Sequence, residues 1–214
     1  FEADGKFLIM TLDNHAIVIN PMLTGRFRVF MRYRNPTRAD MISFQTDGPT
    51  LWYSDIKKMG RVYLVPRADY SSVAGFSDRG PSVLDSAVTL EIFMRRLKQF
   101  NGQIKNVLRN QRFLKGIGNA YADEILLYAG ILPFRKRASL SLQEVEKLYI
   151  SMKKVLTRIE EILAARSLDD ITTEKRDFLM IHNKGGGICP LCGGRVSEVR
   201  ANRFKTSYCQ TCQK

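Results

Sequence analysis

The chain contains no run of apolar residues that approaches the ~20 needed to cross a bilayer as a helix. It also lacks an internal repeat, a low-complexity tract and a recognisable secretory segment. It does not begin with methionine but opens on Phe1-Glu2-Ala3-Asp4, close to its first strand-like segment. With 214 residues, 44% of them hydrophobic, there is material for two domains and a small appendage. We expect a cytoplasmic monomer with no membrane contact.

Cysteine is missing from most of the chain. All four cysteines lie in the last 26 residues as two Cys-x-x-Cys pairs, Cys189/Cys192 and Cys209/Cys212, with sixteen residues between them. Two such pairs at this separation suit a tetrahedral thiolate zinc site with a β-hairpin between the pairs. Two disulfides or a redox pair are the alternative, but disulfides fit poorly because all four cysteines share one terminal patch.

We therefore expect one structural Zn²⁺ bound by Cys189, Cys192, Cys209 and Cys212, with no open position for catalysis. The apolar residues expected to pack beside this metal are Val196, Val199 and Tyr208.

Acidic residues are scarce in two segments. The chain has 34 Lys+Arg against 21 Asp+Glu, a net charge of +13. Residues 182–214 hold six basic side chains against Glu198 alone, and residues 95–137 hold ten against Asp123 and Glu124. Such concentrations indicate a polyanionic partner, since a generally basic protein would spread its charge more evenly. A membrane surface is disfavoured because no basic amphipathic segment carries exposed aromatics. The favoured partner is nucleic acid.

The order of patterns predicts an α+β fold. Residues 1–67 contain short strand-like segments separated by turn residues, which is typical of a β-sandwich: 7–10, 16–19, 27–31, 41–44, 51–53 and 62–65. Residues 68–86 are rich in Ser, Gly, Asp and Pro and read as a linker. Residues 87–181 follow as a helical domain, and residues 182–214 as a four-cysteine finger.

Two features of the helical domain stand out. Ser141 and Glu144 form a capping box that opens a long helix, whose apolar stripe we assign to the core. Gly116-Ile117-Gly118-Asn119 forms a turn before a helix that ends at Gly130. Its glycines allow a ligand to approach the backbone closely, and a helix N-terminus suits a phosphate. This second signal is weak alone, because many helix–helix turns contain Gly and Asn.

The run Leu-Lys-Gly-Ile-Gly-Asn-Ala-Tyr-Ala-Asp-Glu (residues 114–124), together with the β-rich segment and the finger, resembles the formamidopyrimidine-DNA glycosylase / endonuclease VIII family over essentially the whole chain. The resemblance implies a helix–two-turn–helix element and a zinc β-hairpin that both grip the DNA backbone. It implies a base-excision-repair DNA glycosylase with abasic-site lyase activity, which removes oxidised bases through a Schiff base. The implied partner is double-stranded DNA with a damaged base or an abasic site.

The resemblance also assigns roles in the β-rich part. Lys6 corresponds to a lysine that contacts the phosphate beside the lesion, and the alternative is a solvated lysine at a strand end. Leu23 falls in the loop that fills the hole left by the extruded base, and the alternative is a core residue. Lys57 and Lys58 lie in the second filling loop, which in the family carries Arg and Phe where this chain has Lys57 and Met59. Because lysine cannot make a planar bidentate contact, discrimination by the opposite base is expected to be looser.

In the second half, Lys105 matches a lysine near the abasic site, and Asn119 matches the phosphate-binding asparagine. Both Lys6 and Lys105 are expected to be charged, with no evident desolvation. The family finger places an arginine five residues before its third cysteine, where this chain has Phe204. We expect the neighbouring Arg203 or Lys205 to supply that charge.

The stretch from Asp177 to Cys189 is too short for the loop that covers 8-oxoguanine in purine-specific members. That favours oxidised pyrimidines or a plain abasic-site lyase.

In this family the nucleophile is an amino-terminal proline followed by a catalytic glutamate, and both would precede Phe1. A secondary amine at a chain terminus is partly neutral near pH 7 and can attack the sugar C1′. We expect that this segment is missing from the sequence, and that the 214 residues alone bind DNA without processing it. Two further hypotheses remain open: a non-catalytic, damage-sensing DNA-binding protein of the same fold, and an RNA-binding zinc protein.

Overall fold

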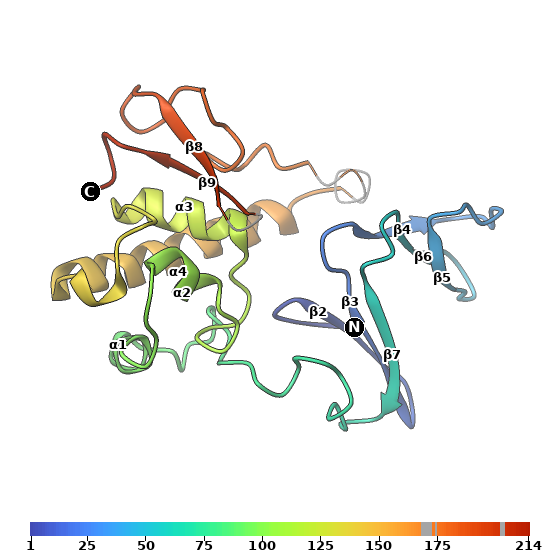
Figure 1. Cartoon of the computed structure of the whole chain (residues 1–214). Coiled ribbons are helices and arrows are strands. Elements are labelled where there is room, and N and C mark those ends of the chain that lie inside the picture. Colours follow the sequence, from blue (N-terminus) through green and yellow to red (C-terminus); the bar gives the residue numbers. More distant parts are fainter. Residues whose placement is uncertain (168–172, 174, 202–203) are drawn as a thin grey trace. The chain divides into compact units, whose positions relative to one another are not determined.

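The computed structural model describes residues 1–167, 173, 175–201 and 204–214, and it is α+β as predicted. The chain divides into two compact units, which we describe one at a time (Figure 1). The first is built mainly from Phe1–Ser77, and the second from Asp78–Ala165 with Arg176–Lys214. Within the described ranges, no helix has both the length and the apolar composition to cross a membrane.

The first unit consists of two antiparallel sheets. One sheet has the order β1-β2-β3-β7, formed by Glu2–Asp4, Phe7–Thr11, His15–Asn20 and Arg61–Pro66. The other has the order β4-β6-β5, formed by Gly25–Phe30, Thr50–Asp55 and Asp40–Phe44. In the second sheet Gly25 on β4 lies opposite Asp55 on β6, so the loop before β4 and the loop after β6 leave the sheet at the same end.

The core of the first unit includes part of the segment that the sequence predicted as a linker. Alternate residues of β2 and β3, among them Phe7 and Val18, form one buried face of the first sheet. Val73, only 2% exposed, packs against this face together with Tyr70 and Phe76. The rings of Phe7 and Phe76 meet edge to face with centroids 5.2 Å apart. Although residues 68–86 are mostly polar, they therefore include a short apolar cluster that covers the buried face of the sheet: Tyr70, Val73 and Phe76.

The second unit is built around helices α1 (Leu90–Leu97), α2 (Ile104–Arg109), α3 (Asn119–Ala129) and α4 (Leu142–Ala164), with a short 3₁₀ turn η1 (Arg137–Ser139). The predicted capping box at Ser141 and Glu144 is present at the start of α4. Helix α3 ends at Gly130, whose φ of 70° is the left-handed conformation that glycine adopts at little cost. The helices share one apolar core, and α3 lies along α4 within it (Figure 1).

The C-terminal hairpin packs on α3. Its strands, β8 (Val196–Ala201) and β9 (Phe204–Cys209), are antiparallel. Leu127 of α3 is buried against Val196 and the cysteines at the base of the hairpin. Gln213 is fully buried, accepts from the Cys209 N–H at 2.7 Å and donates to the Ile131 carbonyl at 2.9 Å. The hairpin is therefore fixed to the helical core at both its base and its C-terminal end.

Candidate functional site

The four cysteines come together at the base of the hairpin. Their sulfur atoms all lie within 4.8 Å of one another, with Cys189 Sγ 3.8 Å from Cys212 Sγ and Cys192 Sγ 3.5 Å from Cys209 Sγ. A tetrahedral zinc site with Zn–S bonds of about 2.3 Å has S–S edges of about 3.8 Å. A disulfide would need about 2.05 Å, and all four cysteines are free. The donor set and its spacing fit a tetrahedral thiolate metal site.

Backbone hydrogen bonds shape this cluster. The Gly194 N–H points at Cys192 Sγ from 3.4 Å, and the turn at Gly193, with φ of 74°, closes the first knuckle. Burial by itself raises the pKa of the Cys209 thiol, but hydrogen bonds from the Cys212 backbone and the Cys192 side chain lower it to about 7. Burial raises the pKa of the neighbouring Cys189 and Cys212 thiols, so among these three cysteines the lowered pKa belongs to Cys209 alone.

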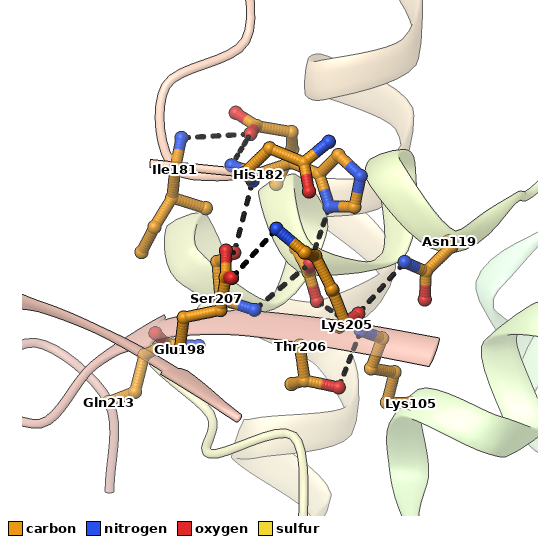
Figure 2. A network of polar contacts seen from close by, with 12 residues as sticks. Lys105, Asn119, Ile181, His182, Glu198, Lys205, Thr206, Ser207 and Gln213 are labelled. Carbon is orange, nitrogen blue, oxygen red and sulfur yellow. Dashed lines mark hydrogen bonds and ion pairs between the residues drawn. The ribbon is translucent and has the colours of Figure 1, made fainter. Parts of the chain in front are cut away.

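Lys105 joins helix α2 to strand β9 and does not point into solvent. Its ammonium lies 2.9 Å from the Lys205 carbonyl oxygen, 2.8 Å from Thr206 Oγ1 and 2.6 Å from Asp123 Oδ1 (Figure 2). The first two contacts are hydrogen bonds and the third is an ion pair, so three protein oxygens surround the ammonium. The side chain is 3% exposed, and burial lowers its pKa, an effect that the charge of Asp123 opposes. The prediction of a lysine without desolvation was therefore wrong.

Asp123 and Glu124 are adjacent on α3 and both are buried. Asp123 Oδ2 is 2.7 Å from His182 Nδ1 and accepts from the Ser207 N–H at 3.2 Å. Glu124 accepts the backbone N–H groups of residues 180–182 at 2.8–2.9 Å. The two acids thus anchor both the segment that enters the finger and the hairpin itself. Sequence reasoning noted them only as exceptions in a basic segment; an acidic pair inside an otherwise apolar helix was the available signal.

Asn119 is the first residue of α3 and contacts the same carbonyl as Lys105. Its Nδ2 donates to the Lys205 carbonyl oxygen at 2.9 Å (Figure 2). The preceding Gly118 is the N-cap and provides no side-chain cap, and a Cβ placed there would meet nothing within 4 Å. Gly116 has a φ of 106°, which requires glycine in this turn. Beside Gly118, at the positive end of α3, there is therefore room for a group to approach, as an anion site needs.

Of the two residues predicted to supply positive charge near the hairpin tip, only Lys205 lies within the described residues. The Lys205 ammonium lies 2.9 Å from Glu198 Oε1 across the hairpin, so its charge is paired. Arg203 lies outside the described residues. Phe204 is 44% exposed, and the Arg109 guanidinium carbon lies 3.7 Å from the centre of its ring.

In the first unit, the loops that carry Leu23 and Lys57 leave the β4-β6 pair at the same end. Leu23 is 67% exposed, which does not suit a core residue, and Lys57 and Lys58 are also exposed. Each loop holds one non-glycine residue in the left-handed conformation, Met22 with φ of 51° and Lys58 with φ of 50°. Such residues cost energy and persist where surrounding contacts fix them.

Asp55 provides those contacts. It is 1% exposed, accepts from the Thr24 hydroxyl in the first loop, and accepts from the Gly60 N–H at 2.6 Å and the Lys57 N–H at 3.2 Å in the second. Burial alone would raise the pKa of Asp55, but these hydrogen bonds lower it. A Cβ on Gly60 would lie 1.9 Å from the Tyr53 hydroxyl, so only glycine fits there. One buried carboxylate thus fixes both loops.

Lys6 lies in the turn between β1 and β2, directly after Gly5 with its φ of 64°, and is exposed. The predicted residues therefore form two separate groups. Lys6, Leu23, Lys57 and Lys58 belong to the first unit; Lys105, Asn119, Lys205 and the four cysteines belong to the second.

Comparisons with known proteins agree with the resemblance seen in the sequence. The formamidopyrimidine-DNA glycosylase N-terminal domain matches residues 1–62, and the formamidopyrimidine-DNA glycosylase H2TH domain matches residues 80–167. A formamidopyrimidine-DNA glycosylase of Thermus thermophilus is 32% identical over 98% of this chain and 79% of its own length. One from Pelotomaculum thermopropionicum is 29% identical over the same shares.

Solved structures give the same answer. The crystal structure of the MutM (Fpg) protein from Thermus thermophilus matches with a TM-score of 0.87 and 30% identity, covering 99% of this chain and 81% of that one. Lactococcus lactis Fpg in complex with abasic-site DNA, 22% identical, has the same fold with a TM-score of 0.88, covering 100% and 80%. With both domain models and a relative above 30% identity, this chain belongs to the formamidopyrimidine-DNA glycosylase family.

Proposed function

We propose that this chain is a DNA glycosylase of base excision repair with abasic-site lyase activity, acting on duplex DNA that contains an oxidised base or an abasic site. Family membership supports the glycosylase activity. The observation that carries the DNA-binding part is the junction of Lys105 and Asn119 on the Lys205 carbonyl. It holds the basic hairpin beside the uncapped end of α3, where a backbone phosphate can meet the helix N–H groups.

The metal in this proposal is one structural Zn²⁺ held by Cys189, Cys192, Cys209 and Cys212. When bound, zinc cross-links the two ends of the hairpin and supplies no open position for chemistry. The surrounding residues then hold the hairpin against α3, so the metal acts on DNA binding through the position of β9.

For the first unit, we propose that Leu23 fills the space left by an extruded base and that Lys57 and Lys58 support the DNA from the second loop. The exposure of Leu23 and the fixed conformation of both loops support this role. Lys6, on the exposed β1-β2 turn, is proposed to contact the phosphate beside the lesion.

The lyase step requires an amine that adds to the C1′ aldehyde of an abasic site and loses water to form an iminium. Removal of a C2′ proton then expels the 3′-phosphate and breaks the strand. Lys105 does not fit this role, because its ammonium is held by Asp123 and by β9 and its side chain is buried. We propose, on the family resemblance, that the nucleophile is an amino-terminal proline upstream of Phe1.

Borohydride trapping tests this function, because reduction converts a Schiff base into a stable covalent adduct. The full-length protein and the 214-residue chain are incubated with duplexes that contain an abasic site, an oxidised pyrimidine or 8-oxoguanine. We expect a covalent adduct with the full-length protein and none with the 214-residue chain. If the full-length protein binds these duplexes but gives no adduct on any of them, the non-catalytic hypothesis replaces this one. Preferential binding of structured RNA would overturn both.

A further inference from the structure

Arg109 and Phe204 form a contact that none of the predicted roles uses. Arg109 is the last residue of α2, and Phe204 is the first residue of β9. The guanidinium carbon lies 3.7 Å from the centre of the phenyl ring, well inside the ~6 Å range of cation–π attraction. The contact joins two elements that are far apart in the sequence and that meet at the hairpin tip.

The donors of Arg109 are not engaged by the described part of the protein. Other basic side chains nearby are paired: Lys105 with Asp123, and Lys205 with Glu198. No described residue forms a hydrogen bond or ion pair with the Arg109 guanidinium. A guanidinium stays protonated near neutral pH, so this is a half-buried charge with unused N–H groups.

The Arg109 guanidinium lies at the same end of the second unit as the N-terminus of α3. Lys105 and Asn119 both donate to the carbonyl of Lys205, the residue directly after Phe204. The charge of Arg109 also acts on Lys105 and Asp123 within that junction. The Arg109 guanidinium and the N-terminus of α3 therefore both contact the start of β9, at Phe204 and Lys205 respectively.

The contact with Phe204 holds the Arg109 side chain in place while its N–H groups remain unbonded to the described residues. A ring against one face of a guanidinium restricts the side chain and leaves the N–H edges available. Those edges match the oxygen spacing of a phosphate, which a guanidinium binds in a bidentate fashion.

We propose that Arg109 binds a phosphate of the DNA backbone, and that Phe204 is its platform. The charge that the hairpin lacks at position 204 is thus supplied from α2 instead of from Arg203 or Lys205. This inference rests on the proposed DNA-binding function and adds to it the residue that provides the guanidinium.

The test is equilibrium binding of Arg109→Leu to a duplex with a tetrahydrofuran abasic-site analogue and to the undamaged duplex. The matched control is Arg112→Leu. Arg112 lies three residues after Arg109, is exposed and pairs with Asp78. We expect Arg109→Leu to weaken binding to both duplexes by about tenfold or more, as for loss of a charged hydrogen bond. The slope of log K against log salt should fall in magnitude by about 1. Arg112→Leu should stay within about twofold of the wild type.

A double variant that places the arginine on the hairpin tests whether the two positions can supply the same phosphate contact. The double variant Arg109→Leu/Phe204→Arg should recover most of the lost affinity and the salt slope. Phe204→Leu alone should give an intermediate loss, because the guanidinium remains but its platform is gone. Thermal unfolding of each variant separates binding losses from misfolding.

The outcomes distinguish this inference from the proposed function. If the wild type fails to bind either duplex, the proposed function fails. If the wild type binds and Arg109→Leu behaves like Arg112→Leu, this inference is overturned while the function stands. A loss in Arg109→Leu that the exchanged pair does not recover would overturn the claim that Arg109 takes the place of a hairpin arginine.

Discussion

The ammonium nitrogen of Lys105 lies 2.6 Å from Asp123 Oδ1, and the two side chains are 3% and 0% exposed. Both side chains have further contacts, since Lys105 also contacts β9 and Asp123 Oδ2 contacts His182 and Ser207. A buried ion pair of this kind gives little net stability compared with apolar residues, but breaking it leaves a buried charge without a partner. The structure thus gives Lys105 a role in fixing the hairpin that the family resemblance did not imply.

The first prediction separates this role from a ligand contact. Lys105→Met should lower the free energy of unfolding of the second unit by about 3–5 kcal/mol, because Asp123 stays buried without the ammonium that faces it. Thermal unfolding followed by helix signal measures this loss. Lys154→Met, which removes an exposed lysine of α4, serves as the control. Adding Asp123→Asn to Lys105→Met should recover part of the loss. Unchanged stability together with weaker DNA binding would make Lys105 a direct phosphate ligand instead.

The second prediction concerns the metal. A chelator that removes zinc should increase hydrogen exchange in residues 185–214 and weaken DNA binding, while α1 to α4 keep their protection. The finger has too few apolar residues to form a core alone, whereas the helical core contains none of the cysteines. Metal analysis should give about one zinc per chain, and Cys192→Ser should reproduce the effect of the chelator. A Cys192→Ser variant that binds DNA like the wild type would contradict the role of the metal.

The third prediction tests the loop residue Leu23. Leu23→Ala should weaken binding to an abasic-analogue duplex by about 5- to 10-fold, the scale of the apolar area lost by the side chain. The undamaged duplex should change by less than about twofold, because no extruded base leaves a space to fill. The control is Leu12→Ala, the same substitution at a leucine that is 45% exposed in the β2-β3 turn. Equal losses on both duplexes would remove Leu23 from this role.

Local patterns predicted much of this fold and less of the site. The capping box at Ser141 and Glu144 and the end of α3 at Gly130 depend on a few neighbouring residues, so the sequence reveals them. The clustering of the four cysteines follows equally from their spacing. Burial of Lys105 depends on a partner 101 residues away, which no local pattern contains.

One expectation at the hairpin was wrong because of strand geometry. Val199 was expected beside the metal with Val196, but it is 37% exposed whereas Val196 is 1% exposed. Residues an odd number of positions apart on a strand face opposite sides, so only one of the two valines can face the cysteines. The guanidinium against the ring of Phe204 comes from α2, a tertiary contact that no local pattern of the finger contains.

The last prediction concerns acid stability of the first unit. The Asp40 side chain is 3% exposed and accepts two hydrogen bonds from Arg34, at 2.8 and 2.9 Å, and one from Ser54 at 2.5 Å. The Arg34 guanidinium, which also lies 4.3 Å from the ring of Trp52, is the largest cause that holds the pKa of Asp40 well below its usual range. A carboxyl whose pKa is lower in the folded than in the unfolded state adds stability above the unfolded value of about 3.9. That contribution is lost as the pH falls below about 4, toward the folded pKa.

The contribution of Asp40 to the free energy of unfolding of this unit should therefore stay nearly constant between pH 7 and 5. It should decrease below about pH 4. Asp40→Asn should cost roughly 2–3 kcal/mol at pH 7, the range for hydrogen bonds to a charged group, and should flatten the acid slope. Trp52 is the single tryptophan of the chain and lies beside Arg34, so its fluorescence reports on this unit during denaturation. The comparison with the variant is needed because the pKa of Asp55 in the same unit is lowered too. An acid slope that Asp40→Asn leaves unchanged would assign the acid sensitivity to Asp55 and the loops it fixes.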